Sequence, residues 1–289
     1  MKQTTLFWIL SASLFTVENT QALDLTYAKG TFDTSFGLRQ MMDFGVALDV
    51  NVLHAKELRL PVYGNWYLFG SIDLYQSDTL DDYASYPDRL LDTSFFGLSP
   101  SDTAASAGAP VPVSFKMHGI DASLGIGYTV WAKARSFLGI GIQTGLSMPY
   151  MQTRNLVKTA EQFVHMLETT KTDITTYKLM PAVSGRYALS RLFSVEGSWA
   201  FGYQYGSIAN DYLKSKADFR GTVMQSDIAL RLTPWQPTGL SFLAGFRFSD
   251  WNVDTMDVTL AETVAHNYSD TFDLGFSSQM FYVGAGWSF

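Results

Sequence analysis

The sequence predicts an all-β protein, a closed antiparallel transmembrane β-barrel of about ten strands. Three observations lead to this class. Ten segments alternate large apolar residues with small or polar ones, which is the period of a strand that has two different faces. Beyond the N-terminal region, no apolar run approaches the roughly 20 residues that a membrane-spanning helix needs. Long and short connections between the segments alternate along the chain, as outer loops and inner turns do when hairpins cross a membrane.

The first 22 residues have the pattern of a signal peptide. Lys2 gives a positive start, residues 6–15 form an apolar stretch, and small residues precede Ala22. The apolar stretch is too short to span a bilayer as a helix. We therefore expect export with cleavage after Ala22, and a mature chain of residues 23–289 that forms one barrel domain.

The composition agrees with a sheet that has one face in lipid and one in water. The chain is 15% aromatic and only 16% charged, with 23 Gly and no Cys. Without Cys an exported protein has no disulfide framework, so closure of the sheet must provide the stability. The formal net charge of −7 argues against nucleic-acid binding, which needs a basic patch.

The strand segments follow from the alternation. It is clearest at Phe193, Val195, Trp199 and Phe201, which alternate with small and polar residues. Counts of eight and twelve strands are the alternatives. The ten segments cover 24–38, 43–54, 62–75, 115–132, 136–151, 173–188, 192–207, 218–233, 239–253 and 271–289.

The connections give an independent test of this assignment. Both termini fall in the periplasm if the count is even and the 39–42 turn lies outside. A soluble β-sandwich or lipocalin-like barrel, the alternative architecture, would not show this asymmetry. The short links cover 55–61, 133–135, 189–191 and 234–238, and the long ones cover 76–114, 152–172, 208–217 and 254–270.

The last segment carries the most specific pattern. Phe281, Val283, Ala285, Trp287 and Phe289 share one face of the predicted strand, and small or polar residues occupy most of the other. This ending resembles the terminal strand of Gram-negative outer-membrane β-barrels. The resemblance implies an integral outer-membrane location, contact with outer-membrane lipid, and an assembly signal for the barrel assembly machinery at Phe281, Val283, Trp287 and Phe289.

If the apolar faces point to lipid, the opposite faces line a lumen. Tyr and Trp at strand ends, among them Trp66, Tyr75, Trp131 and Trp251, are expected in the interfacial girdles. Interspersed opposite charges in a narrow interior tend to pair, because an unpaired buried charge is costly. Five acids and four bases are predicted to line the lumen: Asp49, Asp73, Asp121, Lys178, Arg186, Glu196, Asp227, Arg231 and Arg247.

Two outer loops stand out. The first, 76–114, carries an acidic cluster whose spacing lacks the alternation of a calcium loop, so we expect no metal site there. The second contains a predicted helix at 155–168 with Asn155 as its N-cap. Either segment is suited to contact a partner. The acidic cluster consists of Asp78, Asp81, Asp82, Asp88 and Asp92.

The ten-strand topology is similar to that of the omptin proteases. Residues 207–212 occupy the place where that family carries an Asp and His pair, but here Asp211 has no His beside it. The resemblance therefore implies the fold and not the catalytic mechanism. His266, Ser269 and Asp270 share one loop and form only a weak motif. We expect a protein that is not an enzyme and has no cofactor.

The leading functional hypothesis is a narrow channel for a small polar solute. It requires that Arg186, Arg231 and Arg247 line an open path rather than being neutralised by Glu196 and Asp227. A surface interaction protein that acts through loop 76–114 and helix 155–168 is one alternative. An omptin-like or lipid-acting outer-membrane hydrolase is the other.

Overall fold

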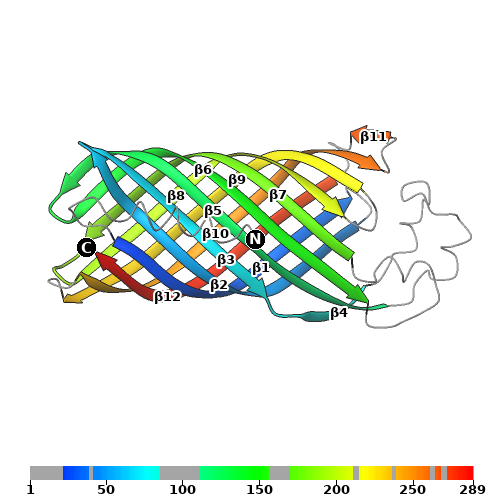
Figure 1. The fold of residues 1–289 in the computed structure, drawn as a ribbon, viewed down its shortest axis with the longest axis horizontal. Helices are drawn as coiled ribbons and strands as arrows, with labels where there is room; N and C mark the ends of the chain where they lie inside the picture. Colours follow the sequence, from blue (N-terminus) through cyan, green and yellow to red (C-terminus); the bar gives the residue numbers. More distant parts are fainter. Residues whose placement is uncertain are drawn as a thin grey trace, which may run out of the picture.

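A computed structural model describes residues 22–38, 42–84, 111–155, 170–210, 215–235, 239–260, 264–267 and 272–288. Within these ranges every element is a β-strand or a turn, and all strand pairs are antiparallel (Figure 1). Ten strands form a ring: β1 (Ala22–Leu38), β2 (Met42–Tyr63), β3 (Trp66–Ser77), β5 (Val111–Lys133), β6 (Ser136–Asn155), β7 (Thr170–Ala188), β8 (Phe193–Asn210), β9 (Ser215–Trp235), β10 (Leu240–Leu260) and β12 (Phe272–Ser288).

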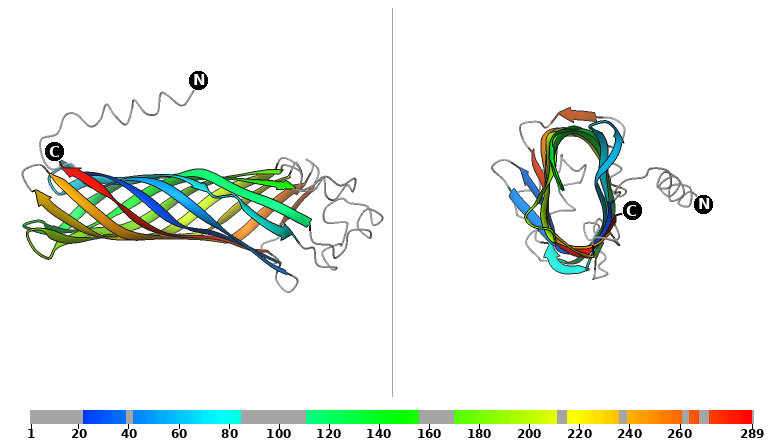
Figure 2. Two further views of the ribbon diagram at one scale, coloured as in Figure 1. Left: turned by 90° about the horizontal axis from the view of Figure 1, so that it is seen from below. Right: turned by 90° about the vertical axis from the view of Figure 1, so that its left-hand side faces the viewer.

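The first and last strands of the ring close it. β1 pairs with β12 along its whole length, from Ala22 opposite Ser288 to Leu38 opposite Phe272. Viewed from one end, the barrel has an oval cross-section (Figure 2). Closure leaves no unpaired strand edge, which is what a sheet needs to cross hydrocarbon. The predicted count of ten strands is confirmed.

Two short strands lie outside the ring. β4 (Leu80–Ala84) pairs with β5, and β11 (Val264–Asn267) pairs with β10. Both extend the sheet at the end of the barrel opposite the start of β1 and the end of β12 (Figure 1). None of the described segments is a helix long and apolar enough to span a membrane.

The two ends of the barrel differ, as predicted. At one end, β2 and β3 meet at Gly64 and Asn65, and β5 and β6 meet at Ala134 and Arg135. We call this the short-turn end, and the lengths of the connections predict that it faces the periplasm. Gly64 and Gly239 adopt positive φ angles of 58° and 66° there, a backbone conformation that glycine tolerates without steric cost. We call the other end the outer end.

Most strands are longer than predicted. β5, for example, has 23 residues, although about 9–11 suffice to cross the hydrocarbon. β2 continues through the predicted link 55–61 as far as Tyr63. A register shift between Glu57 and Leu60 explains this error, because a bulge interrupts the alternation on which the prediction rested.

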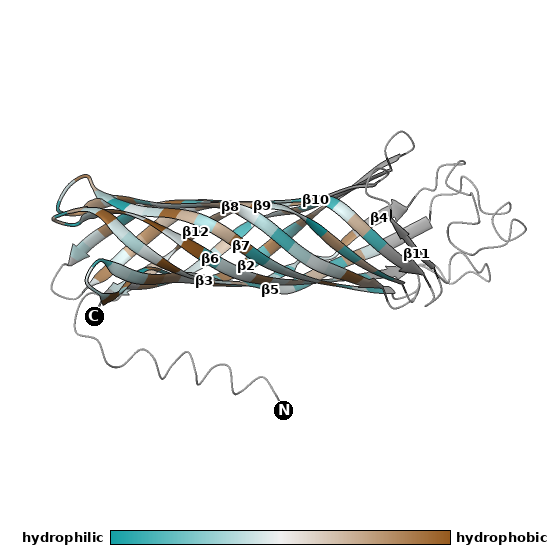
Figure 3. Ribbon diagram, turned by 90° about the horizontal axis from the view of Figure 1, so that it is seen from above, coloured by the Kyte–Doolittle hydropathy of each residue, from teal (hydrophilic) through white to brown (hydrophobic). Residues whose placement is uncertain are grey.

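The outward face of the ring is an apolar belt, and hydrophobic and hydrophilic residues are interspersed along the strands (Figure 3). Large hydrophobic side chains that a soluble protein would bury are exposed around the whole barrel, as contact with lipid requires. Members of the belt include Leu25, Leu53, Leu74, Leu124, Ile126, Ile140, Ile142, Leu179, Trp199, Phe201, Ile228, Leu230, Phe242, Phe281 and Val283.

The predicted girdle residues divide between the two faces of the barrel wall. Trp66 and Trp131 are exposed near the short turns, as expected for a girdle, but Tyr75 and Trp251 are 7% and 4% exposed and point into the lumen. Their assignment to a lipid-facing girdle is wrong.

Asn155, the predicted N-cap, is the last residue of β6. The remainder of the predicted helix 155–168 lies outside the described residues.

Candidate functional site

The lumen near the short-turn end is occupied by a network centred on Arg231. From β9, Arg231 donates through Nε and Nη2 to the two carboxylate oxygens of Glu196 on β8, at 2.5 and 3.1 Å. Its Nη2 also lies 2.5 Å from Oδ2 of Asp24 on β1, and its Nη1 lies 2.5 Å from Oγ of Ser241 on β10. From β7, Arg186 donates to Glu196 at 2.6 Å. Two arginines thus neutralise two buried carboxylates.

Gly286 on β12 makes room for this network. A β-carbon at Gly286 would lie 2.1 Å from Oδ1 of Asp24 and 2.6 Å from Nη1 of Arg231. Both distances are well below van der Waals contact, so a larger residue would displace the ion pair. The small residues on the inner face of β12 therefore have a packing role.

A second ion pair lies further along the lumen. Nζ of Lys56 on β2 is 2.5 Å from Oδ1 of Asp227 on β9. The same carboxylate oxygen accepts a hydrogen bond from the Tyr282 hydroxyl of β12 at 2.9 Å. All three side chains are buried or nearly so. Strands β2, β9 and β12 are thereby linked through the interior.

His54 of β2 and Arg247 of β10 share the carboxylate of Asp73 on β3. Nδ1 of His54 contacts one oxygen of Asp73, and Nη1 of Arg247 lies 2.5 Å from the other. Arg247 also lies 3.1 Å from Nδ1 of His54. A histidine and an arginine on one buried carboxylate form a local charge cluster.

The fourth ion pair borders the outer half of the lumen. Nζ of Lys178 on β7 is 2.6 Å from Oδ2 of Asp121 on β5, and Ser147 of β6 donates to the same oxygen at 2.5 Å. The Lys178 ammonium also lies 4.3 Å from the centre of the Trp251 ring, within the range of a cation–π interaction. Lys178 thus contacts both the ion pairs of the lumen and a layer of aromatic side chains next to them.

The aromatic layer occupies the outer half of the lumen. Phe32 packs against three rings, with centroid distances of 6.2 Å to Tyr75, 6.4 Å to Trp251 and 6.2 Å to Phe276. Trp251 and Phe276 are themselves 5.7 Å apart. Buried aliphatic side chains continue this cluster toward the outer end, among them Leu48, Val50, Met117, Ile174 and Val253.

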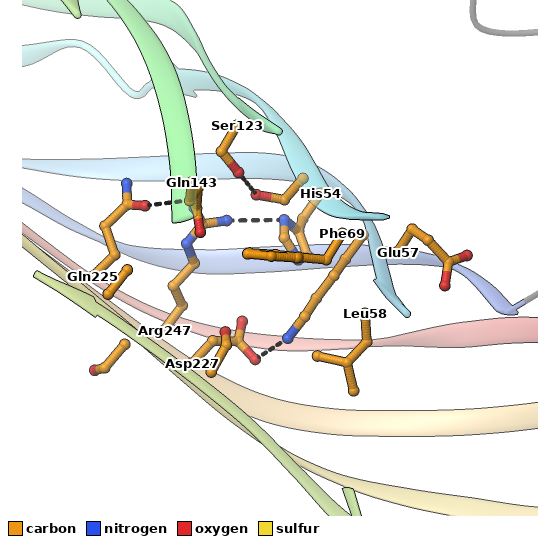
Figure 4. A pocket seen from close by; sticks show the side chains of 15 residues that line it. His54, Glu57, Leu58, Phe69, Ser123, Gln143, Gln225, Asp227 and Arg247 are labelled. Atoms are coloured by element: carbon orange, nitrogen blue, oxygen red, sulfur yellow. Dashed lines mark hydrogen bonds and ion pairs between the residues drawn. The ribbon is translucent and has the colours of Figure 1, made fainter. Parts of the chain in front are cut away.

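Between the ion pairs lies a small polar cavity of about 40 Å³ (Figure 4). His54, Asp227 and Arg247 line it, together with Gln143 and Gln225, whose side chains are hydrogen-bonded at 3.3 Å. A buried water needs roughly 10–15 Å³ and several polar partners, so this space suits only a few water molecules. It is too small for an organic substrate.

The structure brings most of the predicted luminal residues together. Seven of them are buried inside the barrel, and Arg186 is partly buried with its side chain 27% exposed. The seven are Asp73, Asp121, Lys178, Glu196, Asp227, Arg231 and Arg247. Each is engaged in an ion pair with another luminal residue.

The prediction for Asp49 is wrong. Its neighbours Leu48 and Val50 are 1% and 2% exposed inside the lumen, so Asp49 points outward, and it is exposed. Near the outer end the lumen is apolar, and this reverses the usual assignment of polar residues to the inner face of a strand. The sequence pattern was therefore assigned to the wrong face at this point of β2.

Sequence reasoning also missed several members of the network. Asp24, His54, Lys56 and Tyr282 all contribute to buried ion pairs or hydrogen bonds. His54 and Lys56 are even numbers of residues away from Leu48 along β2, so they lie on the same luminal face of the strand. A prediction that continued β2 through this segment would have placed them there.

The final strand has the two predicted faces. Phe281, Val283 and Trp287 are exposed on the outside, at 71% for Phe281, whereas Tyr282 is 4% exposed and points into the lumen. Phe289 lies outside the described residues. Their role as an assembly signal stays a prediction.

The remaining predicted site residues that the structure describes lie at the outer end. Asp78 is exposed, and its backbone N–H donates to the backbone carbonyl of Asp49 at 2.9 Å. Asp81 and Asp82 belong to β4, and His266 to β11. The described residues do not include Asp88, Asp92, Asp211, Ser269 and Asp270.

Comparison with known proteins establishes the fold. No protein-family model and no curated protein matches the chain. The outer-membrane protease OmpT from Escherichia coli is similar in structure, with a TM-score of 0.52 and 10% sequence identity over 95% of this chain and 99% of that chain. Two weaker likenesses are the attachment invasion locus protein Ail of Yersinia pestis (TM-score 0.31, 8% identity, 93% and 99% covered) and the P. putida toluene transporter TodX (TM-score 0.30, 7% identity, 94% and 91% covered).

The likeness to OmpT is one of architecture, because 10% identity carries no information on activity. Together with the exposed apolar belt, it agrees with the location that the sequence predicts. The chain is an integral outer-membrane β-barrel of ten strands, and in its described part the interior is filled by ion pairs and an aromatic layer.

Proposed function

We propose that this protein is a non-conducting, non-enzymatic outer-membrane barrel that acts as an interaction protein through its outer end. The observation that carries the proposal is the filling of the lumen. Ion pairs occupy the half nearer the short turns, and packed aromatic and aliphatic side chains occupy the outer half. A barrel of ten strands is near the size at which side chains alone fill the interior.

The ion pairs formed by the luminal arginines argue against a permanently open channel. A selective channel needs charged side chains that face a water-filled path. Here Arg231 is bound by Glu196 and Asp24, Arg186 by Glu196, and Arg247 by Asp73. Moving a permeant ion past these pairs would require breaking buried charge contacts.

The cavity beside His54 also lacks space for catalysis. His54 is the buried histidine, but it is held between Asp73 and Arg247 beside a cavity of only about 40 Å³. A general base needs access to its substrate within hydrogen-bonding distance. The proposal therefore assigns His54 to the structural network.

The outer end is the surface left for interaction. Several ring strands are about twice the length that crosses the hydrocarbon, so part of the sheet projects beyond the lipid. In sequence, the connection 76–114 has six Asp and Arg89 as its single basic residue. Such a segment attracts a partner with a basic surface, and the attraction weakens as salt is added.

The proposal is tested on the refolded chain in phospholipid vesicles. We expect no flux of small sugars, amino acids or phosphate into the vesicles. We also expect salt-sensitive binding of a fluorescent oligolysine probe. A variant with residues 85–110 replaced by a Gly/Ser linker removes three of the six Asp and should bind the probe more weakly while it remains folded. Solute flux, or unchanged probe binding by the linker variant, would contradict the proposal.

A gated channel is the second candidate, and one observation favours it. The polar cavity beside His54 and Arg247 is an interruption in the packed interior. For conduction the aromatic layer around Trp251 would have to open. Voltage-dependent current from the unmodified chain would favour this candidate over the sealed barrel.

A further inference from the structure

The short-turn end of the barrel contains a partly enclosed cavity, which we call the vestibule. Its volume is about 400 Å³, within the range of small-ligand sites. The ends of β2, β7 and β9, the start of β10, and the turns after β5 and β7 form its walls. The Arg231 network separates it from the rest of the lumen.

The charge of the vestibule is strongly biased. Its described lining contains five arginines and one acidic residue, namely Arg59, Arg135, Arg186, Arg191, Arg231 and Glu57. The two carboxylates of Glu196 and Asp24 neutralise part of this charge through Arg231 and Arg186. Among the described residues named here, five are basic and three are acidic, so bases outnumber acids around the vestibule.

Arg59 is held in a position suited to a ligand. Its guanidinium carbon lies 5.0 Å from the centre of the Phe137 ring and 6.0 Å from that of Tyr67. Stacking on these rings fixes the plane of the guanidinium while leaving its edge available for hydrogen bonds. Nε of Arg59 is buried and has no hydrogen-bond partner among the described residues. A buried donor of this kind points to a partner from outside the chain.

Arg135 is anchored as well. Its Nη1 donates to the backbone carbonyl of Arg191 at 2.6 Å, which ties the turn after β5 to the turn after β7. Arg186 is fixed through Nε by Glu196 and remains 27% exposed at the side chain. Arg59, Arg135 and Arg186 thus each have a contact that restrains the guanidinium group, which reduces the entropy lost on binding.

We propose that the vestibule is a binding site for an oxyanion of the phosphate class, reached from the periplasmic side. Planar guanidinium groups on β2, on β7 and in the turn after β5 match the several acceptor oxygens and the double negative charge of a phosphate group. The group belongs either to a small phosphorylated molecule or to the headgroup of a phospholipid. Both sources offer the same chemistry to Arg59 and Arg135.

Isothermal titration tests the proposal with the full refolded chain in a phosphate-free detergent. Inorganic phosphate and glycerol 3-phosphate are the probes, at low ionic strength because salt screens the attraction. We expect saturable binding that falls by about tenfold or more in Arg59→Gln and in Arg135→Gln. The matched control is Arg220→Gln, since Arg220 is exposed on β9 away from the vestibule, and it should bind as the unmodified chain does.

The same titration in nanodiscs distinguishes the two sources. If a phospholipid headgroup is the ligand, binding of soluble phosphate should be abolished in nanodiscs that contain phosphatidylglycerol. In pure phosphatidylcholine nanodiscs the same binding should be weakened but still measurable. If the ligand is a soluble molecule, binding persists in both. Absence of saturable binding to the unmodified chain, or equal loss in Arg220→Gln, would overturn the proposal. Arg135 lies in an exposed turn, so its variant keeps the test valid even if Arg59→Gln does not fold.

Discussion

Arg231 and Glu196 are joined by two hydrogen bonds, at 2.5 and 3.1 Å, on adjacent strands of the barrel. They are diagonal neighbours, because Arg231 lies opposite Ser194 and Glu196 lies opposite Ala229. Arg231 also reaches Asp24 on the first strand, 207 residues away in sequence. One guanidinium thus links β8 and β9 with β1 through the interior of the ring.

Replacement of Arg231 by Met should destabilise the barrel strongly. Asp24 would lose its ion-pair partner and Glu196 would keep only Arg186 while both carboxylates remain buried, and such a loss costs about 3–5 kcal/mol. The free energy of unfolding can be measured by urea titration in vesicles, followed by tryptophan fluorescence. Arg220→Met, on the exposed face, should change it by less than about 1 kcal/mol. Equal effects of the two variants would mean that the network does not hold the interior together.

Trp251→Ala should weaken the aromatic layer. The variant removes the ring that contacts Phe32, Phe276 and Lys178, and truncation of a buried aromatic residue costs about 3–5 kcal/mol. We also expect it to give small conductance steps in planar bilayers, because the outer half of the lumen loses its largest side chain. Trp199→Ala, at a lipid-facing position, is the control and should remain silent.

Ile126→Arg tests the lipid-facing belt. Ile126 is exposed on β5, eight residues before the turn at Ala134, and a positive charge near the bilayer midplane costs about 2–4 kcal/mol. Ala209→Arg, exposed near the outer end of β8, should cost no more than about 1 kcal/mol. Equilibrium folding into vesicles measures both. Comparable costs at the two positions would place the membrane elsewhere on the barrel.

Ala134→Gly should stabilise the protein by about 1 kcal/mol. Ala134 has a φ of 51°, in the left-handed region, where an L-residue with a β-carbon is strained by roughly 1–2 kcal/mol. The same change at Ala132, which pairs with Phe137 in the β5–β6 ladder, should instead destabilise by about 0.5–1 kcal/mol. Urea midpoints of the two variants give the comparison, and a destabilised Ala134→Gly variant would rule out the strain.

The strand count and the outward face were predictable because lipid imposes a simple rule on the sequence. Trp199, Phe201, Phe281 and Val283 alternate with small and polar residues, and the structure exposes all four. The assembly of ten such segments into a ring follows from the need to pair every strand edge in hydrocarbon.

The composition of the lumen was harder to predict because it changes along the barrel axis. Near the short turns it contains the ion pairs beside a few buried apolar side chains such as Tyr67 and Phe137, and Glu196 and Arg231 were assigned correctly. Near the outer end it is packed with apolar side chains such as Leu48 and Trp251, and there the alternation of apolar and polar residues no longer distinguishes inside from outside. The errors at Asp49, Tyr75 and Trp251 have this single cause.

The pairing of charges was not predictable from spacing. Lys56 and Asp227 are 171 residues apart, and Arg231 and Asp24 are 207 apart. Their contact depends on the register of every strand between them and on where the ring closes. A one-residue slip in any pair would move a whole set of side chains to the other face.

The central claim is that the lumen is closed, and single-channel recording of the unmodified chain tests it most directly. Heat-dependent gel migration would first confirm that the refolded chain forms a closed barrel. We predict that this folded barrel inserts into planar bilayers without stable unitary conductance. Reproducible conductance steps from the folded, unmodified chain would show that the ion pairs of Arg231, Arg247 and Lys178 do not seal the interior, and would contradict the account.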